Sequence, residues 1–165
     1  MNKKKAECYC CGRKGYQENY IEEQLDDEGH SIYFCCEHCR SVTSDEEILK
    51  EKIYSLYQSI IGTKTLNKTV KGYIRNRLDN EYKDKKEILY RLMKERKDKI
   101  SEIIIDKNFP NGIVRAKFIL KCIEKDVFAE HRRQQKYNDI KAEEIIPSRT
   151  TIIRKIRDIS KWLEE

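Results

Sequence analysis

No stretch of this 165-residue sequence is apolar over the roughly 18 residues that a membrane-spanning helix needs. The basic start, Met1 to Lys5, is not followed by an apolar stretch, so we expect no secretory signal and a cytoplasmic protein. Aliphatic residues are too sparse for an extensive β-sandwich, whereas charged residues make up 39% of the chain. This composition predicts a mainly α fold whose helices expose charged faces.

Motifs of the common enzyme classes are missing as well. The sequence contains no phosphate-cradling glycine loop, no HExxH and no nucleophile elbow. His131 stands beside Glu130, but the expected place for this acid–base pair is a helix surface. Together with His30 and His38 it does not make the pattern of an HNH-type nuclease. We therefore expect no enzymatic activity.

Six of the seven cysteines fall within 32 residues, which in a reducing compartment indicates a metal site. Cys8 and Cys11 form a CxxC pair in front of Gly12, which permits a tight turn. The second pair is either Cys36 with Cys39, in CxxC spacing, or Cys35 with Cys39, in CxxxC spacing. The pattern predicts a structural zinc ion bound by four thiolates, because such a closed shell leaves no position for a reactive water. The predicted ligands are Cys8, Cys11, Cys36 and Cys39, with Cys35 as the alternative to Cys36.

This cysteine pattern resembles that of a known group of fingers. The pair at Cys8 and Cys11, followed by Tyr33-Phe34-Cys35-Cys36-Glu37-His38-Cys39, is similar to the TRASH/MYM group of treble-clef-like fingers. The second half of that motif typically reads aromatic-Phe-Cys-Ser-x-x-Cys. The resemblance implies the ligands Cys8, Cys11, Cys35 and Cys39 and puts Cys36 at the position of the serine. It covers about a quarter of the chain, and the choice between Cys35 and Cys36 stays open.

We predict two parts, a zinc-binding β module over residues 1–43 and a basic helical domain of about five helices over residues 44–165. In the first part, two short strands are joined by a turn at Gly29. In the second, a capping box of Ser44 and Glu47 opens a helix that ends at Gly62. Further helices are expected over 65–79, from the Asp84–Glu87 capping box toward Ile104, over Ile113–Val127 after a break at Phe109–Gly112, and from Pro147 onward.

Charge is divided unevenly, because residues 1–63 carry a net charge of −4 and residues 64–165 one of +10. This asymmetry predicts an anionic partner, with DNA favoured over RNA. One candidate surface is a helix-turn-helix over 66–97, and another is a lysine stripe on the following helix with two arginines beyond it. The candidate contacts are Arg75, Arg77, Lys83, Lys85, Lys86, Arg91, Lys117, Lys121, Lys125, Arg132 and Arg133. The competing interpretation is that these are ordinary solvated helix faces.

Together these patterns favour a zinc-stabilised, non-enzymatic nucleic-acid-binding regulator, with transcription as the regulated process. The helical part is similar to uncharacterised proteins of Gram-positive phages and mobile elements, which suggests the same origin. The alternative is a protein-interaction module whose acidic finger docks on a host enzyme or defence complex and inhibits or modulates it. The oligomeric state stays open, because apolar stripes on the last two helices suit a dimer or a monomeric core.

Overall fold

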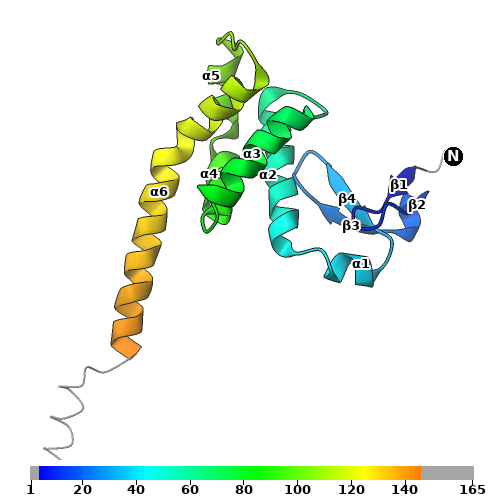
Figure 1. The fold of residues 1–165 in the computed structure, drawn as a ribbon, viewed down its shortest axis with the longest axis horizontal. Helices are drawn as coiled ribbons and strands as arrows, with labels where there is room; N and C mark the ends of the chain where they lie inside the picture. Colours follow the sequence, from blue (N-terminus) through cyan, green and yellow to red (C-terminus); the bar gives the residue numbers. More distant parts are fainter. Residues whose placement is uncertain (1–3, 146–165) are drawn as a thin grey trace, which may run out of the picture. The chain divides into compact units, whose positions relative to one another are not determined.

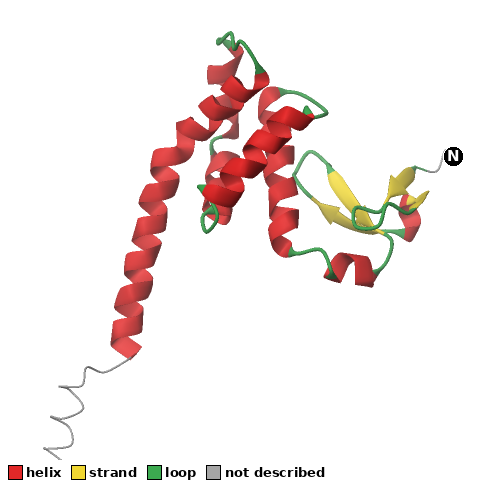
Figure 2. Cartoon of the chain, in the orientation of Figure 1, coloured by secondary structure: helices red, strands yellow, loops and turns green. Residues whose placement is uncertain are grey.

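The structure, a computed structural model, describes residues 4–145. It is mainly α, as predicted, with a small β region at the N-terminus (Figures 1 and 2). The elements in chain order are β1 (Lys5–Glu7), β2 (Lys14–Tyr16), the 3-10 turn η1 (Gln17–Asn19), β3 (Ile21–Gln24), β4 (Ser31–Phe34), α1 (Glu37–Ser41), α2 (Asp45–Ile61), α3 (Lys68–Asn80), α4 (Lys86–Glu95), α5 (Lys97–Ile105) and α6 (Gly112–Ile145). Within the described residues, no helix combines the length and apolar character that a membrane span requires.

The β region consists of two antiparallel hairpins. The predicted hairpin is confirmed as β3–β4, with Ile21 opposite Phe34 in the register. The sequence did not indicate the second hairpin, β1–β2, whose strands have only three residues each. A single parallel bridge between Cys8 and Tyr33 joins the two hairpins. This bridge brings the first cysteine pair next to the end of β4.

Helix α2 has the ends that the sequence predicts. The Ser44 side chain accepts a hydrogen bond from the backbone amide of Glu47, which satisfies one of the free donors of the first turn. Gly62 ends the helix with a φ of 68°, in the left-handed region where glycine carries no Cβ penalty. One face of α2 is buried against α3, α4 and α5. This face carries Ile53, Leu56 and Tyr57 into the core.

Two helices, α4 and α5, replace the single helix predicted from the Asp84–Glu87 capping box toward Ile104. The capping box at Asp84 and Glu87 is wrong, because α4 begins at Lys86 and no side chain caps it. The backbone amide of Lys85 bonds instead to the carbonyl of Tyr82 in a turn that precedes the helix. The helix expected to extend toward Ile104 is interrupted at Arg96, whose φ and ψ of −108° and 9° are not helical.

Helix α6 is longer than the predicted Ile113–Val127 and begins, as expected, after the break at Phe109–Gly112. Its predicted apolar stripe is confirmed for Ala116, Leu120, Ile123 and Val127, all of which are buried. Val127 ends the first of two compact units, and the part of α6 from Phe128 onward belongs to the second. The last predicted helix, with Ile152, Ile156, Ile159 and Leu163 on one face, lies outside the described residues.

Candidate metal centre and nucleic-acid interface

Four cysteine sulfurs gather in one place at the β hairpins. The Sγ atoms of Cys8, Cys11, Cys35 and Cys39 all lie within 4.8 Å of one another. Cys35 Sγ is 3.6 Å from the sulfurs of both Cys11 and Cys39. A tetrahedral zinc ion with Zn–S bonds of about 2.3 Å holds its sulfurs about 3.8 Å apart. The donor set and its spacing therefore fit a metal ion of this kind.

Each pair of sulfurs is positioned by local backbone geometry. Cys8 and Cys11 lie in the turn between β1 and β2, where the amide of Gly12 bonds to the carbonyl of Cys8 at 2.9 Å. Gly12 has a φ of 72°, so a side chain at this position would strain the turn. Cys35 follows directly on β4, and Cys39 lies in α1. The turn, the strand end and the short helix thus supply the four donors from three elements.

The structure gathers Cys35 and not Cys36, which corrects our preference for Cys36. Cys36 occupies the N-cap position of α1, where its side chain is exposed. Its sulfur lies 3.9 Å from that of Cys35 but outside the group of four. The bridge between Cys8 and Tyr33 decides this, because it brings the backbone amide of Cys35 to within 3.4 Å of Cys8 Sγ. Cys10, His30 and His38 lie outside the group as well.

Backbone amides favour the thiolate form at one of the four positions. Burial by itself would raise the pKa of the Cys8 thiol, but hydrogen bonds from the amides of Cys11, Cys35 and Cys10 lower it to about 6. Metal binding needs deprotonated thiols, so these amides also prepare the sulfur as a ligand. They take the role of second-shell donors around a thiolate site.

The cysteine site shares its core with helix α2. Cys8, Phe34, Cys39 and Ile48 form one buried cluster, and Ile48 belongs to the first turn of α2. The Tyr9 hydroxyl donates a hydrogen bond to the Glu51 carboxylate at 3.1 Å, which adds a polar contact between the turn at Cys8 and Cys11 and the same helix. The zinc-binding β module predicted over residues 1–43, here called the finger, therefore packs on helix α2. The predicted domain boundary at residue 43 stays a prediction.

The acidic turn of the finger is engaged within the molecule. Asp26 accepts hydrogen bonds from His30 and from the Ser55 hydroxyl of α2. Asp27 forms an ion pair of 2.8 Å with Lys94 of α4, and Glu28 pairs with Lys97 of α5. These carboxylates already have partners from three helices, or from the turn itself. The acidic surface that the alternative function would offer to a host protein is correspondingly reduced.

Acid is expected to weaken this connection between the turn and the helices. Burial raises the pKa of Asp26, but hydrogen bonds from Ser55 and His30 outweigh it and lower the pKa below the usual value. A carboxyl whose pKa is lowered by folding stabilises the protein above its unfolded pKa of about 4, and this contribution is lost as the pH falls. We expect the free energy of unfolding of Asp26→Asn, measured in urea between pH 5 and pH 3, to fall less steeply than that of the unmodified protein.

The control for this measurement is Asp45→Asn, because the Asp45 side chain is 95% exposed. Acid also protonates any thiolates of the cysteine cluster, but it does so in all three proteins. The difference between the pH profiles therefore reports the carboxyl alone. Equal slopes for Asp26→Asn and the unmodified protein would contradict the assignment.

No known protein family, curated protein or solved structure matches this chain. The resemblance to the TRASH/MYM fingers and to phage and mobile-element proteins consequently stays a prediction.

The basic residues of the predicted helix-turn-helix are largely used inside the structure. Lys86 is only 4% exposed and bonds to Glu46 of α2 at 2.9 Å, so it is wrong as a contact to phosphate. Arg77 forms ion pairs with Glu81 and Glu124. Arg75 lies 3.8 Å from Glu47, and Arg91 pairs with Glu95. Of the other two residues of the set, Lys85 is half-buried and Lys83 is exposed. A recognition helix contacts base edges with its N-terminal residues, but Lys86, the first residue of α4, is buried. The geometry of α4 therefore does not suit a recognition helix.

The lysines of α6 are placed differently. Lys117, Lys121 and Lys125 are exposed, and within the described part of the chain none of them has a carboxylate within 4 Å. The acidic residues nearby, Glu124 and Asp126, pair instead with Arg77 and Arg96. Three positive side chains are thus presented to solvent on the face of α6 opposite its buried stripe.

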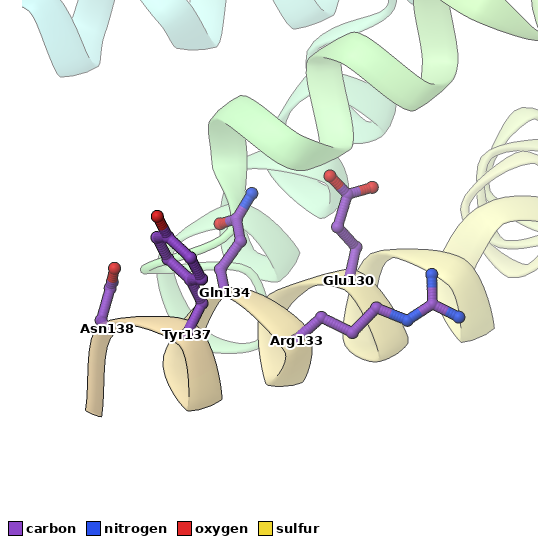
Figure 3. Close-up of a pocket in the computed structure, with 5 residues that line it drawn as sticks. All are labelled: Glu130, Arg133, Gln134, Tyr137 and Asn138. Atoms are coloured by element: carbon purple, nitrogen blue, oxygen red, sulfur yellow. The ribbon is translucent and has the colours of Figure 1, made fainter. Parts of the chain in front are cut away.

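Arg132 and Arg133 are both exposed on the later part of α6. Arg133 lines a shallow pocket whose other described lining residues also come from α6, namely Glu130, Gln134, Tyr137 and Asn138 (Figure 3). The lining includes one residue of each charge and no cluster of metal-ligating side chains. We assign no ligand to this pocket.

Proposed function

We propose that this chain is a zinc-stabilised, non-enzymatic protein that binds nucleic acid through Lys117, Lys121 and Lys125. The observation that carries the proposal is the contrast between two basic surfaces. Most basic side chains of α3 to α5 pair with carboxylates, whereas within the described residues Lys117, Lys121 and Lys125 of α6 do not. Charges without internal partners are the ones available to phosphates.

The spacing of the three lysines supports this role. Four residues of α-helix advance by about 6 Å, so the stripe from Lys117 to Lys125 is about 12 Å long. The Debye length at physiological ionic strength is about 8 Å. Neighbouring lysines lie within it, and their potentials add along the stripe. Such a field attracts a polyanion, and release of its counterions provides affinity that depends on salt.

Zinc has a structural part in the proposal. The ion would be held by Cys8, Cys11, Cys35 and Cys39, and it would supply the stability that such short strands lack. Because the cysteine site and α2 share a core, the ion would also support the helices that carry the basic surface. We propose that such a protein regulates transcription for a phage or mobile element, because the sequence predicts a resemblance of its helical part to uncharacterised proteins of Gram-positive phages and mobile elements.

The test compares two triple variants that remove the same charge. Lys117→Ala/Lys121→Ala/Lys125→Ala clears the stripe on α6 and keeps good helix formers at exposed positions. It is expected to weaken binding to a labelled oligonucleotide and to reduce the slope of log affinity against log salt by about 2, which corresponds to three lost phosphate contacts on a single strand. The measurement is fluorescence anisotropy over a salt series.

The matched control is Arg75→Ala/Lys83→Ala/Arg91→Ala, which removes three charges from the predicted helix-turn-helix. We expect its salt slope to stay close to that of the unmodified protein. A larger loss in this control than in the α6 variant would move the interface to the helix-turn-helix. If the unmodified protein binds no nucleic acid at low salt, the proposal is wrong.

A further inference from the structure

Two phenylalanine rings lie at the start of the lysine stripe. Phe109, in the turn before α6, and Phe118, on α6, have ring centroids 5.4 Å apart and an interplanar angle of 52°. Both side chains are only half-buried. Lys107 places its Nζ 4.5 Å from the Phe118 ring centroid, and the Arg115 guanidinium lies 5.7 Å from that of Phe109. Two cationic side chains therefore lie against the aromatic pair.

The ring of Phe118 belongs to the same helix face as the lysines. Lys121 and Lys125 follow it at positions i+3 and i+7, which stand above one another on an α-helix. Lys117 is its neighbour in sequence, and Val114, one turn earlier, is 39% exposed. Apolar and cationic side chains are thus interleaved along one face, a pattern different from the purely polar surface that solvation alone would favour.

This mixture suits one form of nucleic acid better than the other. A duplex presents its phosphates but keeps the faces of its bases stacked inside the helix. A single strand presents both, and proteins that bind single strands combine a basic track with aromatic rings on which bases stack. The part of the half-buried Phe118 ring that lies under Lys107 becomes accessible to a base once that lysine turns toward a phosphate.

We infer that the face formed by Phe109, Phe118, Lys117, Lys121 and Lys125 binds single-stranded nucleic acid, with a base stacked on the phenylalanine pair and the phosphates on the lysines. The inference rests on the proposed function and adds the strandedness of the ligand to it. Lys107 leaves the Phe118 ring when the base arrives and joins the phosphate contacts. Glu124 and Asp126, the acidic residues of this part of α6, pair with Arg77 and Arg96 and do not oppose the strand.

The decisive comparison uses three probes of equal length: oligo-thymidine, an abasic oligonucleotide with the same phosphates, and a duplex. Stacking on an aromatic side chain is worth about 1–3 kcal/mol per base, so oligo-thymidine is expected to bind roughly 5- to 150-fold more tightly than the abasic strand. Phe118→Leu should abolish this difference and leave the affinity for the abasic strand unchanged. Tyr137→Leu is the matched control, because it removes an exposed aromatic ring elsewhere on α6.

Each result separates the inference from the proposed function. Salt-dependent binding of oligo-thymidine and the abasic strand with equal affinity overturns the stacking and leaves the lysine surface intact. Tighter binding of the duplex overturns the single-strand assignment. Binding of phosphatidylserine vesicles that depends on Phe118, without any oligonucleotide binding, overturns both in favour of a membrane surface. The affinity for the abasic strand also shows whether Phe118→Leu has kept the helix folded.

Discussion

Cys35→Ser is expected to weaken zinc binding by about 100-fold, whereas Cys36→Ser should leave it nearly unchanged. The two residues are neighbours in sequence, but only the sulfur of Cys35 belongs to the group of four. Structural zinc binds with about 10–16 kcal/mol in small domains, so one ligand of four accounts for roughly 3 kcal/mol. The affinity would be measured by competition with a chromophoric chelator.

A second measurement on the same pair counts the thiolates directly. Cobalt can take the place of zinc, and the intensity of its thiolate charge-transfer band follows the number of sulfur ligands. We expect the band to fall by about a quarter in Cys35→Ser and to be retained in Cys36→Ser. If Cys36→Ser weakens metal binding more than Cys35→Ser does, the ligand is Cys36, in CxxC spacing with Cys39, and the assignment of Cys35 is wrong.

Phe34→Ala is expected to lower the free energy of unfolding by about 3–5 kcal/mol, because it empties a fully buried site. The ring packs among Cys8, Cys39 and Ile48, and the Arg40 guanidinium lies 5.7 Å from its centroid. Loss of the ring removes contacts of the metal ligands and of α2 at once. We therefore expect zinc affinity to fall together with stability, as measured by urea unfolding and by chelator competition.

Val42→Ala provides the comparison for this variant. Val42 lies just after α1 and is 57% exposed, so its truncation should change stability by less than about 0.5 kcal/mol. A loss below about 1 kcal/mol in Phe34→Ala would show that the finger and the helices do not share a cooperative core. Normal zinc affinity despite a large loss of stability would separate the metal site from that core.

The features that sequence predicted well are those decided by neighbouring residues. The cap at Ser44 and the left-handed end at Gly62 depend on one or two side chains, and both are found where expected. The turn at Gly12 and the apolar stripe of α6 are local patterns of the same kind. Their physical causes act over four residues or fewer, so a single sequence contains them.

The features that sequence missed depend on contacts between distant segments. Spacing left open the choice between Cys35 and Cys36, and only the resemblance to the TRASH/MYM fingers implied Cys35. The bridge between Cys8 and Tyr33 brings Cys35 to the site, and spacing alone cannot reveal that bridge. Lys86 and Lys121 look alike in a helical pattern, but one is buried against Glu46 and the other is exposed. Long-range pairing of charges therefore decides which basic residues remain available for a ligand, and a single sequence does not specify it.

The acidic turn has a consequence for the order of folding during synthesis. Glu28 bonds to a lysine 69 positions later in the chain, and Asp26 to a serine 29 positions later. When residues 1–43 leave the ribosome, the lysine that completes the contact of Glu28 has not yet emerged. The early chain already contains the four clustered cysteines but cannot finish packing until α5 emerges, so contacts of such sequence separation should form late and slow the final step. A bound metal ion would then first hold the β hairpins of the nascent chain together and only later stabilise the helices that pack on them.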